Sequence, residues 1–171
     1  MVAAKDGTIY ISDISVTAKP EDNPGGTIFR FDPTTGVVTK HMEPSGMSAG
    51  LHVDKNGTLW IAQTANPKGA RRLVRQDLAT GAITEVAATY QGKKLNGPND
   101  ITSDPQGRIY FTDAVFFVRD AMELPNSVYR RSELERIADP EIKAYAMRQF
   151  DEGTVFSDEY SLRMIHIVNY F

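Results

Sequence analysis

The stretch that decides the fold is Leu95–Ala114, LNGPNDITSDPQGRIYFTDA, which joins a polar turn, a tight glycine turn and an aromatic strand. Its second half, in which apolar and aromatic residues follow a glycine, occurs three times, as KDGTIYISD, KNGTLWIAQ and PQGRIYFTD. The three glycines, Gly7, Gly57 and Gly107, are 50 residues apart. Repeats of this length are typical of propellers and solenoids.

A second repeated feature is a hairpin turn. Asp32–Gly36 (DPTTG) and Asp77–Gly81 (DLATG) each separate two runs of alternating apolar residues, and glycine can adopt the positive φ that such turns need. Each unit therefore holds four short strands in about 45 to 50 residues, which is the content of a propeller blade. Tyr10, Trp60 and Tyr110 occupy one equivalent position and are expected to pack within the blades. The predicted fold is an all-β propeller.

We predict one partial propeller domain over residues 1–171. Its repeat units are expected at about 1–46, 47–95, 96–150 and 151–171. The first unit begins without a leading strand of its own, and the third should continue into a strand at Ser127–Arg130. No hairpin turn follows there, and 132–150 (SELERIADPEIKAYAMRQF) is rich in helix formers. For that segment, a helical insertion and a strand pair stay equally open.

Composition excludes several classes of function. The net charge of −3 comes from 22 acidic and 19 basic residues mixed along the chain, so no basic surface is expected to attract nucleic acid. No apolar run approaches the roughly 18 residues of a membrane span, so no membrane partner is expected. The absence of cysteine excludes disulfides and thiolate chemistry. No signal peptide is visible, which leaves a cytoplasmic location open, or a periplasmic or secreted one if the N-terminus is truncated.

Four motifs together carry a resemblance to a known family. They are Gly50–Gly57 (GLHVDKNG), Gly69–Leu73 (GARRL), Leu95–Asp100 (LNGPND) and Gly107–Asp113 (GRIYFTD). From Lys5 to about Tyr129 the chain resembles the senescence marker protein/gluconolactonase family, also called regucalcin-like. The resemblance implies a six-bladed β-propeller with a divalent cation, usually calcium, near the centre of one face. It also implies hydrolysis of sugar lactones or related esters.

The resemblance also implies metal ligands. The family places the Asn of a Pro-Asn-Asp motif at the central site, and here that residue is Asn99. Calcium takes amide and carboxylate oxygens, which agrees with this role. A second family ligand, normally an Asn, aligns with Glu152. The family's leading Glu would lie before Met1, and its later Asp, a ligand and general base, belongs to a blade that the chain does not reach. The catalytic base is therefore unknown.

Three further residues are candidates for substrate binding: Asp100, His52 and Arg71. Each has an alternative, because Asp100 could cap a turn, His52 could fill a half-buried strand position, and Arg71 could form a surface ion pair. Asp13 and Asp113, at the ends of their strands, are expected to cap those ends rather than to bind substrate. No Gly-Xaa-Ser-Xaa-Gly motif is present, which disfavours a serine hydrolase.

Two functions from different classes remain. The first is a metal-dependent hydrolase of sugar lactones or related esters. The second is a catalytically inactive propeller fragment that acts as a binding or assembly module. A closed six-bladed ring needs about 300 residues, so 171 residues make three to four blades. An unclosed ring exposes strand edges that can pair with another chain, so a second chain that completes the propeller is an expected partner.

Overall fold

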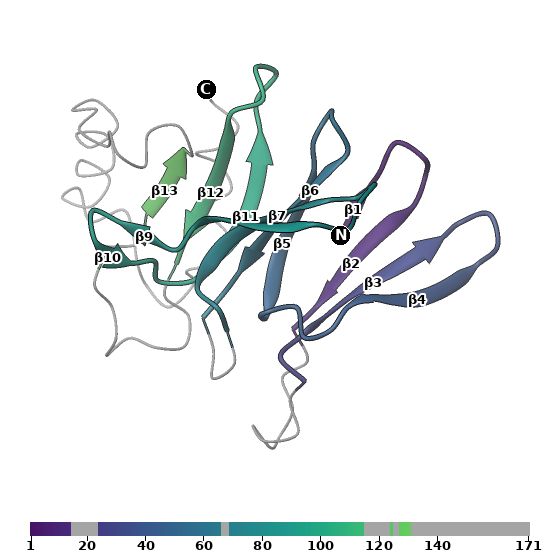
Figure 1. Cartoon of the computed structure of the whole chain (residues 1–171), viewed down its shortest axis with the longest axis horizontal. Coiled ribbons are helices and arrows are strands. Elements are labelled where there is room, and N and C mark those ends of the chain that lie inside the picture. Colours follow the sequence, from purple (N-terminus) through teal and green to yellow (C-terminus); the bar gives the residue numbers. More distant parts are fainter. Residues whose placement is uncertain (15–23, 66–68, 115–123, 125–126, 131–171) are drawn as a thin grey trace, which may run out of the picture. The chain divides into compact units, whose positions relative to one another are not determined.

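The computed structural model describes residues 1–14, 24–65, 69–114 and 124, and the backbone of 127–130 (Figure 1). The chain divides into two compact units, Met1–Arg131 and Ser132–Phe171, and all described residues belong to the first. Their regular structure consists entirely of β-strands. Glu152 and the segment 132–150 lie outside the described residues, so the expectations for them stay predictions.

The described residues form three antiparallel sheets of three or four strands that follow one another along the chain, each with its strands in sequence order, and one two-stranded hairpin. Sheet 1 consists of β1 (Val2–Ala3), β2 (Ile9–Asp13), β3 (Thr27–Asp32) and β4 (Val37–Met42). Sheet 2 consists of β5 (Ser48–Val53), β6 (Thr58–Gln63), β7 (Arg72–Asp77) and β8 (Ile83–Ala87). Sheet 3 consists of β11 (Pro98–Ser103), β12 (Ile109–Asp113) and β13 (Ser127–Arg130). A small hairpin, β9 (Thr89–Tyr90) and β10 (Lys93–Lys94), connects sheets 2 and 3.

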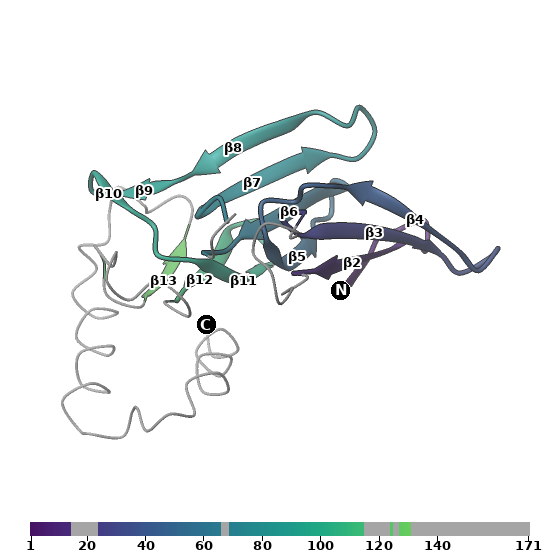
Figure 2. The same cartoon turned by 90° about the horizontal axis from the view of Figure 1, so that it is seen from below.

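This arrangement is that of a propeller. Each sheet is a meander, and Figure 2 shows the strands of sheet 2 in the succession β8, β7, β6, β5. The first strand of sheet 2, β5, contacts β1 and β2 on one side and β11, the first strand of sheet 3, on the other. The fold is therefore an all-β, partial propeller, as predicted. One expectation was wrong: the first unit does have a leading strand, β1, which pairs with β2 but is too short to show an alternating pattern.

The repeated glycine turns have the same geometry in all three sheets. In each, the glycine amide donates a hydrogen bond to the carbonyl three residues earlier, at 2.9 to 3.0 Å. Gly7, Gly57 and Gly107 have φ values of +85°, +79° and +81°. These values lie in the left-handed region, where a Cβ would be strained. The turn chemistry read from the sequence is thus confirmed.

The aromatic residue after each glycine turn packs within its sheet, as predicted. In sheet 2 the indole Nε1 of Trp60 donates to a carboxylate oxygen of Asp54 (2.9 Å), and in sheet 3 the hydroxyl of Tyr110 donates to Asp104 (3.2 Å). The same aspartates also accept backbone amides of their turns. Each carboxylate therefore ties the turn to the strand that follows it.

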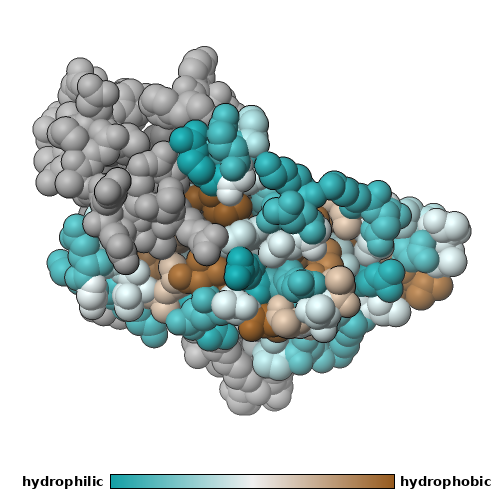
Figure 3. All heavy atoms as spheres, turned by 45° about the horizontal axis from the view of Figure 1, so that its top comes forward, coloured by the Kyte–Doolittle hydropathy of each residue, from teal (hydrophilic) through white to brown (hydrophobic). Residues whose placement is uncertain are grey.

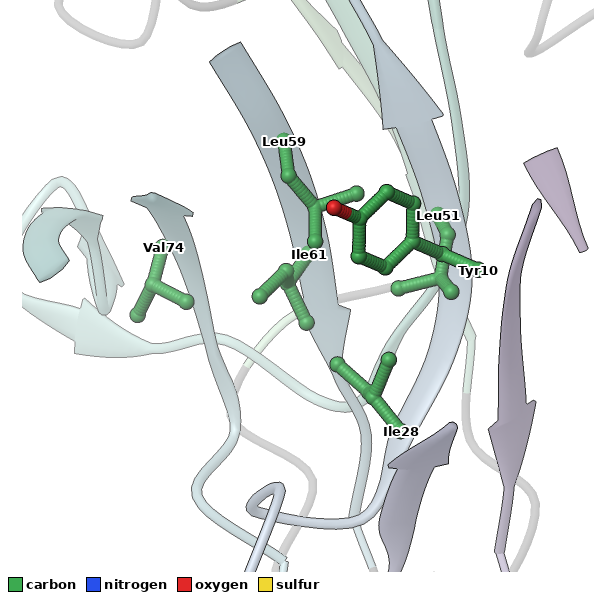
Figure 4. Packing of buried hydrophobic residues seen from close by; sticks show 6 residues of the cluster. All are labelled: Tyr10, Ile28, Leu51, Leu59, Ile61 and Val74. Atoms are coloured by element: carbon green, nitrogen blue, oxygen red, sulfur yellow. The ribbon is translucent and has the colours of Figure 1, made fainter. Parts of the chain in front are cut away.

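Sheets 1 and 2 share a hydrophobic core. Its buried members are Tyr10, Ile28, Leu51, Leu59, Ile61 and Val74. In Figure 4 the side chains of Tyr10 and Ile28, from sheet 1, lie against those of sheet 2. The Tyr10 ring also meets the His41 ring edge-on, with centroids 4.8 Å apart. Face-to-face packing of consecutive sheets is how a propeller buries its apolar strands.

The outer hairpins also match the sequence. The Gly36 amide donates to the Asp32 carbonyl, and the Gly81 amide donates to the Asp77 carbonyl, both at 2.8 Å. On the face shown in Figure 3, apolar residues form separate patches among polar ones. In the part of the chain that the structure describes, the exposed large apolar side chains other than Met1 belong to the outer strands β4 and β8, namely Val37, Val38 and Ile83. Among the described residues, no helix has the length and apolar character needed to cross a membrane.

Candidate functional site

The first strands of sheets 2 and 3 carry a bulge at the same place. In β5 the pairing register with β6 shifts between Ser48 and Leu51, and in β11 the register with β12 shifts between Pro98 and Ile101. The two bulges are 50 residues apart, so they belong to the repeat. A bulge redirects side chains and is frequent beside functional sites. In β11 the two residues inside the bulge are Asn99 and Asp100.

The bulges of β5 and β11 lie in main-chain contact through Gly50. A Cβ added to Gly50 would lie 2.5 Å from the carbonyl oxygen of Asn99 and 2.8 Å from the Cα of Asp100. Only a residue without a side chain permits this approach. A glycine inside a strand pattern is a sequence signal for such an approach. Gly50 therefore helps to set the position of Asn99.

Asn99 is half-buried, and among the described residues its side-chain amide has no hydrogen-bond partner. Asp100 is exposed, and its carboxylate accepts the backbone amide of Ile101 at 2.8 Å. The amide of Asp100 donates to the hydroxyl of Thr112 at 3.0 Å. The local hydrogen bond of Asp100 corresponds to the turn-cap alternative. The side-chain amide of Asn99 makes no such local bond to the described residues.

His52 lies on β5 away from Asn99. Its Nε2 is 2.8 Å from the hydroxyl oxygen of Ser103, the last residue of β11. Ser103 is four residues after Asn99, roughly 13 Å along an extended strand. Burial lowers the pKa of His52, while the charge of Asp54 opposes this change. The structure thus gives His52 a half-buried position that bridges two sheets, and it does not bring His52 together with Asn99.

Arg71 lies beside the turn that leads into β11. Its Nε donates to the carbonyl oxygens of Leu95 (2.7 Å) and Asn96 (2.9 Å). Arg71 itself has φ +54°, in the left-handed region, immediately before β7. The guanidinium is therefore bound to backbone carbonyls three and four residues before Asn99 in the sequence. Its role as an anion-binding group stays a prediction.

Asp113 anchors the same turn from the other side. Its side chain is fully buried, and its two carboxylate oxygens accept the backbone amides of Asn96 (2.8 Å) and Gly97 (2.7 Å). Asp113 thus makes the capping contacts that were expected of it, on the turn that precedes β11. Burial raises the pKa of Asp113 from 3.8 to about 6, although the two amides and the charge of Arg71 act in the opposite direction.

The described residues do not complete a metal site. None of their histidine, aspartate and glutamate side chains gather in a group of three that could hold a metal ion. Asn99 contributes one oxygen of the kind that calcium prefers. Since Glu152 lies outside the described residues, the predicted ligand pair stays a prediction.

Comparisons with known proteins agree with this geometry. A gluconolactonase from Zymomonas mobilis is 31% identical over 104 aligned residues. A gluconolactonase structure from Xanthomonas campestris is 29% identical, with a TM-score of 0.53. The X-ray structure of a second protein, assigned to the gluconolactonases, is 30% identical, with a TM-score of 0.52. The chain is similar to gluconolactonases. No protein-family model matches it.

The gluconolactonase-like region is a part of each of these proteins. The match covers 54% of this chain but 28% of the Zymomonas protein. The two structures are matched over 61% of this chain and over 36% and 37% of their own lengths. The chain therefore spans about a third of the gluconolactonases that it matches, and the family resemblance deduced from the motifs is confirmed over that region.

The raised pKa of Asp113 predicts a pH dependence of stability in this gluconolactonase-like chain. A carboxyl group with a raised pKa in the folded state contributes stability that is present below about pH 4 and is lost as the pH rises through about 6. We expect the free energy of unfolding to fall by up to about 3 kcal/mol over this interval because of Asp113.

Urea denaturation from pH 4 to 7, compared between the native chain and Asp113→Asn, measures this contribution. The native chain should lose stability relative to the variant as the pH rises. Among the described residues, the other carboxylates with shifted pKa values are Asp6, Asp32, Glu43, Asp54, Asp77 and Asp104, and their shifts are downward. They are present in both proteins and act mainly below pH 4, so they cancel. Parallel pH profiles would contradict the prediction.

Proposed function

We propose that this chain forms part of a metal-dependent hydrolase of sugar lactones or related esters. The observation that carries the proposal is the position of Asn99. Its amide lies half-buried in the bulge of the first strand of sheet 3, without a hydrogen-bond partner in the described part of the chain. The similarity to gluconolactonases supports the class of reaction.

The residues of this chain would bind the cation and orient the lactone. The amide oxygen of Asn99 would hold a divalent cation, with calcium as the first choice because its ligands are oxygens. A bound calcium ion would polarise the lactone carbonyl and stabilise the negative charge that develops on its oxygen. Asp100 is next to Asn99 in sequence, and its exposed carboxylate would accept a hydrogen bond from a sugar hydroxyl. Arg71 would meet an anionic substituent.

The remaining ligands and the catalytic base would come from elsewhere. Glu152 is the further candidate ligand within this chain. A second chain that completes the propeller would supply the others, because the first strand of each blade can direct one side chain toward the common axis. The proposed partner molecules are thus a small lactone or ester and a second polypeptide.

Replacing Asn99 by alanine tests the proposal. We expect calcium affinity to fall at least about 10-fold and kcat/KM for gluconolactone to fall about 100-fold, since one oxygen donor is lost from the site. Calorimetric titration with calcium and a pH-stat assay measure the two effects. Asn56→Ala is the matched control because Asn56 is exposed in a glycine turn of sheet 2, and it should change neither value.

The possible results separate the two functional hypotheses. Calcium binding that Asn99→Ala leaves unchanged would remove Asn99 from the site. A native chain that associates with a second copy, yet neither binds calcium nor hydrolyses the lactone, would contradict the enzyme and favour the binding or assembly module. Light scattering on the same samples reports whether a second copy associates.

A further inference from the structure

The residue at the end of the second strand differs in type among the three sheets. Asp13, Gln63 and Asp113 end the second strand of sheets 1, 2 and 3. In sheet 2 the neutral Gln63 holds the turn before the first strand, because its Nε2 donates to the carbonyl of Ser45 (2.8 Å) and its Oε1 accepts Nε of Arg72 (2.6 Å). In sheet 3 a fully buried carboxylate does this work.

Burying a carboxylate costs free energy. Removing a carboxylate from water disfavours its charged form, and the raised pKa of Asp113 reflects this cost. A neutral amide holds the equivalent turn of sheet 2. Apart from its charge, the carboxylate differs from an amide because both of its oxygens can accept hydrogen bonds. Asp113 uses both of them, on the consecutive amides of Asn96 and Gly97.

The turn Leu95–Gly97 is held on its acceptors as well as on its donors. Arg71 reaches across from sheet 2 and donates to the carbonyls of Leu95 and Asn96. The space around Gly97 is also closed, because an added Cβ would lie 2.9 Å from the carbonyl oxygen of Ala114. This turn is followed at once by Pro98 and Asn99. The orientation of the turn backbone therefore determines the position of the Asn99 Cα, from which the side-chain amide extends.

We propose that Asp113 and Arg71 are positioning residues for Asn99. Their hydrogen bonds fix both the donors and the acceptors of the Leu95–Gly97 turn, and the fixed turn holds the side-chain amide of Asn99 in one orientation. The functional meaning of this orientation rests on the proposed function, because Asn99 is the residue assigned there to the metal. The hydrogen-bond geometry itself does not depend on that assignment.

Nuclear magnetic resonance on the ¹⁵N-labelled chain tests the inference without any metal. In Asp113→Asn, one oxygen becomes an amino group that faces a backbone amide. We expect the Asn99 side-chain amide signals, assigned with Asn99→Ala, to shift or broaden. We also expect hydrogen exchange at Asn96 and Gly97 to accelerate at least about 10-fold. Asp104→Asn, in the other turn of sheet 3, is the matched control and should leave these signals in place.

Arg71→Ala gives an independent reading, since Arg71 is partly exposed and its loss leaves the core intact. It should move the same Asn99 signals, and this variant decides the matter if Asp113→Asn fails to fold. Unchanged Asn99 signals and unchanged exchange in the folded variants would overturn the inference.

Calcium titration of the same samples separates the two proposals. A native chain that binds no calcium counts against the proposed function, while the Asn99 signals still report on positioning. Where calcium binds, Asp113→Asn should weaken it at least about 10-fold.

Discussion

Gly50→Ala is expected to destabilise the chain by about 3 kcal/mol, the upper part of the range for overpacking a closed contact. The new Cβ would lie 2.5 Å from the carbonyl oxygen of Asn99 and 2.8 Å from the Cα of Asp100. Both atoms belong to the backbone, so no side chain can rotate away to make room. The first strands of sheets 2 and 3 would have to separate. Urea denaturation followed by the fluorescence of Trp60, the single tryptophan, measures the loss.

Gly57→Ala is the matched control, because Gly57 is needed for its positive φ and not for a close backbone contact. Gly57 has φ +79°, and nothing lies within 4 Å of the position that its Cβ would take. Its replacement should cost about 1 kcal/mol from backbone strain alone. If Gly50→Ala cost no more than Gly57→Ala, the close approach of β5 and β11 would be wrong.

Asp113→Ala is expected to have a similarly large effect, a loss of about 3 kcal/mol in the free energy of unfolding. The substitution removes the acceptor of two buried backbone amides, those of Asn96 and Gly97, and water cannot easily replace it because the site is fully buried. The loss should be greater at pH 4.5 than at pH 7, since the native carboxyl group is more favourable when it is neutral.

Asp13→Ala provides the comparison for this second variant. Asp13 ends the equivalent strand of sheet 1 but is exposed, so its removal should cost less than about 1 kcal/mol. Equal losses in the two variants would show that the buried hydrogen bonds of Asp113 contribute little. Chemical denaturation at both pH values gives the four numbers that the comparison needs.

Most of the fold could be predicted from local sequence. The glycine turns at Gly7, Gly57 and Gly107 and the hairpin turns after Asp32 and Asp77 were all identified correctly. Turn conformation depends on a few neighbouring residues, and glycine is the residue that tolerates positive φ. The repeat of 50 residues then implied that equivalent segments have equivalent structures. The propeller followed from these two observations.

The candidate site could be predicted only in part. The position of Asn99 on the first strand of sheet 3 followed from the repeat and from the Pro-Asn-Asp motif. The environment of His52 did not, because its distance from Asn99 depends on which residues of β5 and β11 face each other. The roles of Arg71 and Gly50 were missed for the same reason. Each depends on a contact with a segment 24 to 50 residues away, from Arg71 to Leu95 and from Gly50 to Asp100.

Local chemistry thus settled which residues turn and which extend, since both properties are decided by a residue and its near neighbours. The tertiary structure decided which of the polar residues meet. Gln63 and Asp113 occupy equivalent places in the repeat, yet one donates to a carbonyl and the other accepts two amides. That difference arises from the partners that packing brings to each side chain, and those partners come from other turns and from neighbouring sheets.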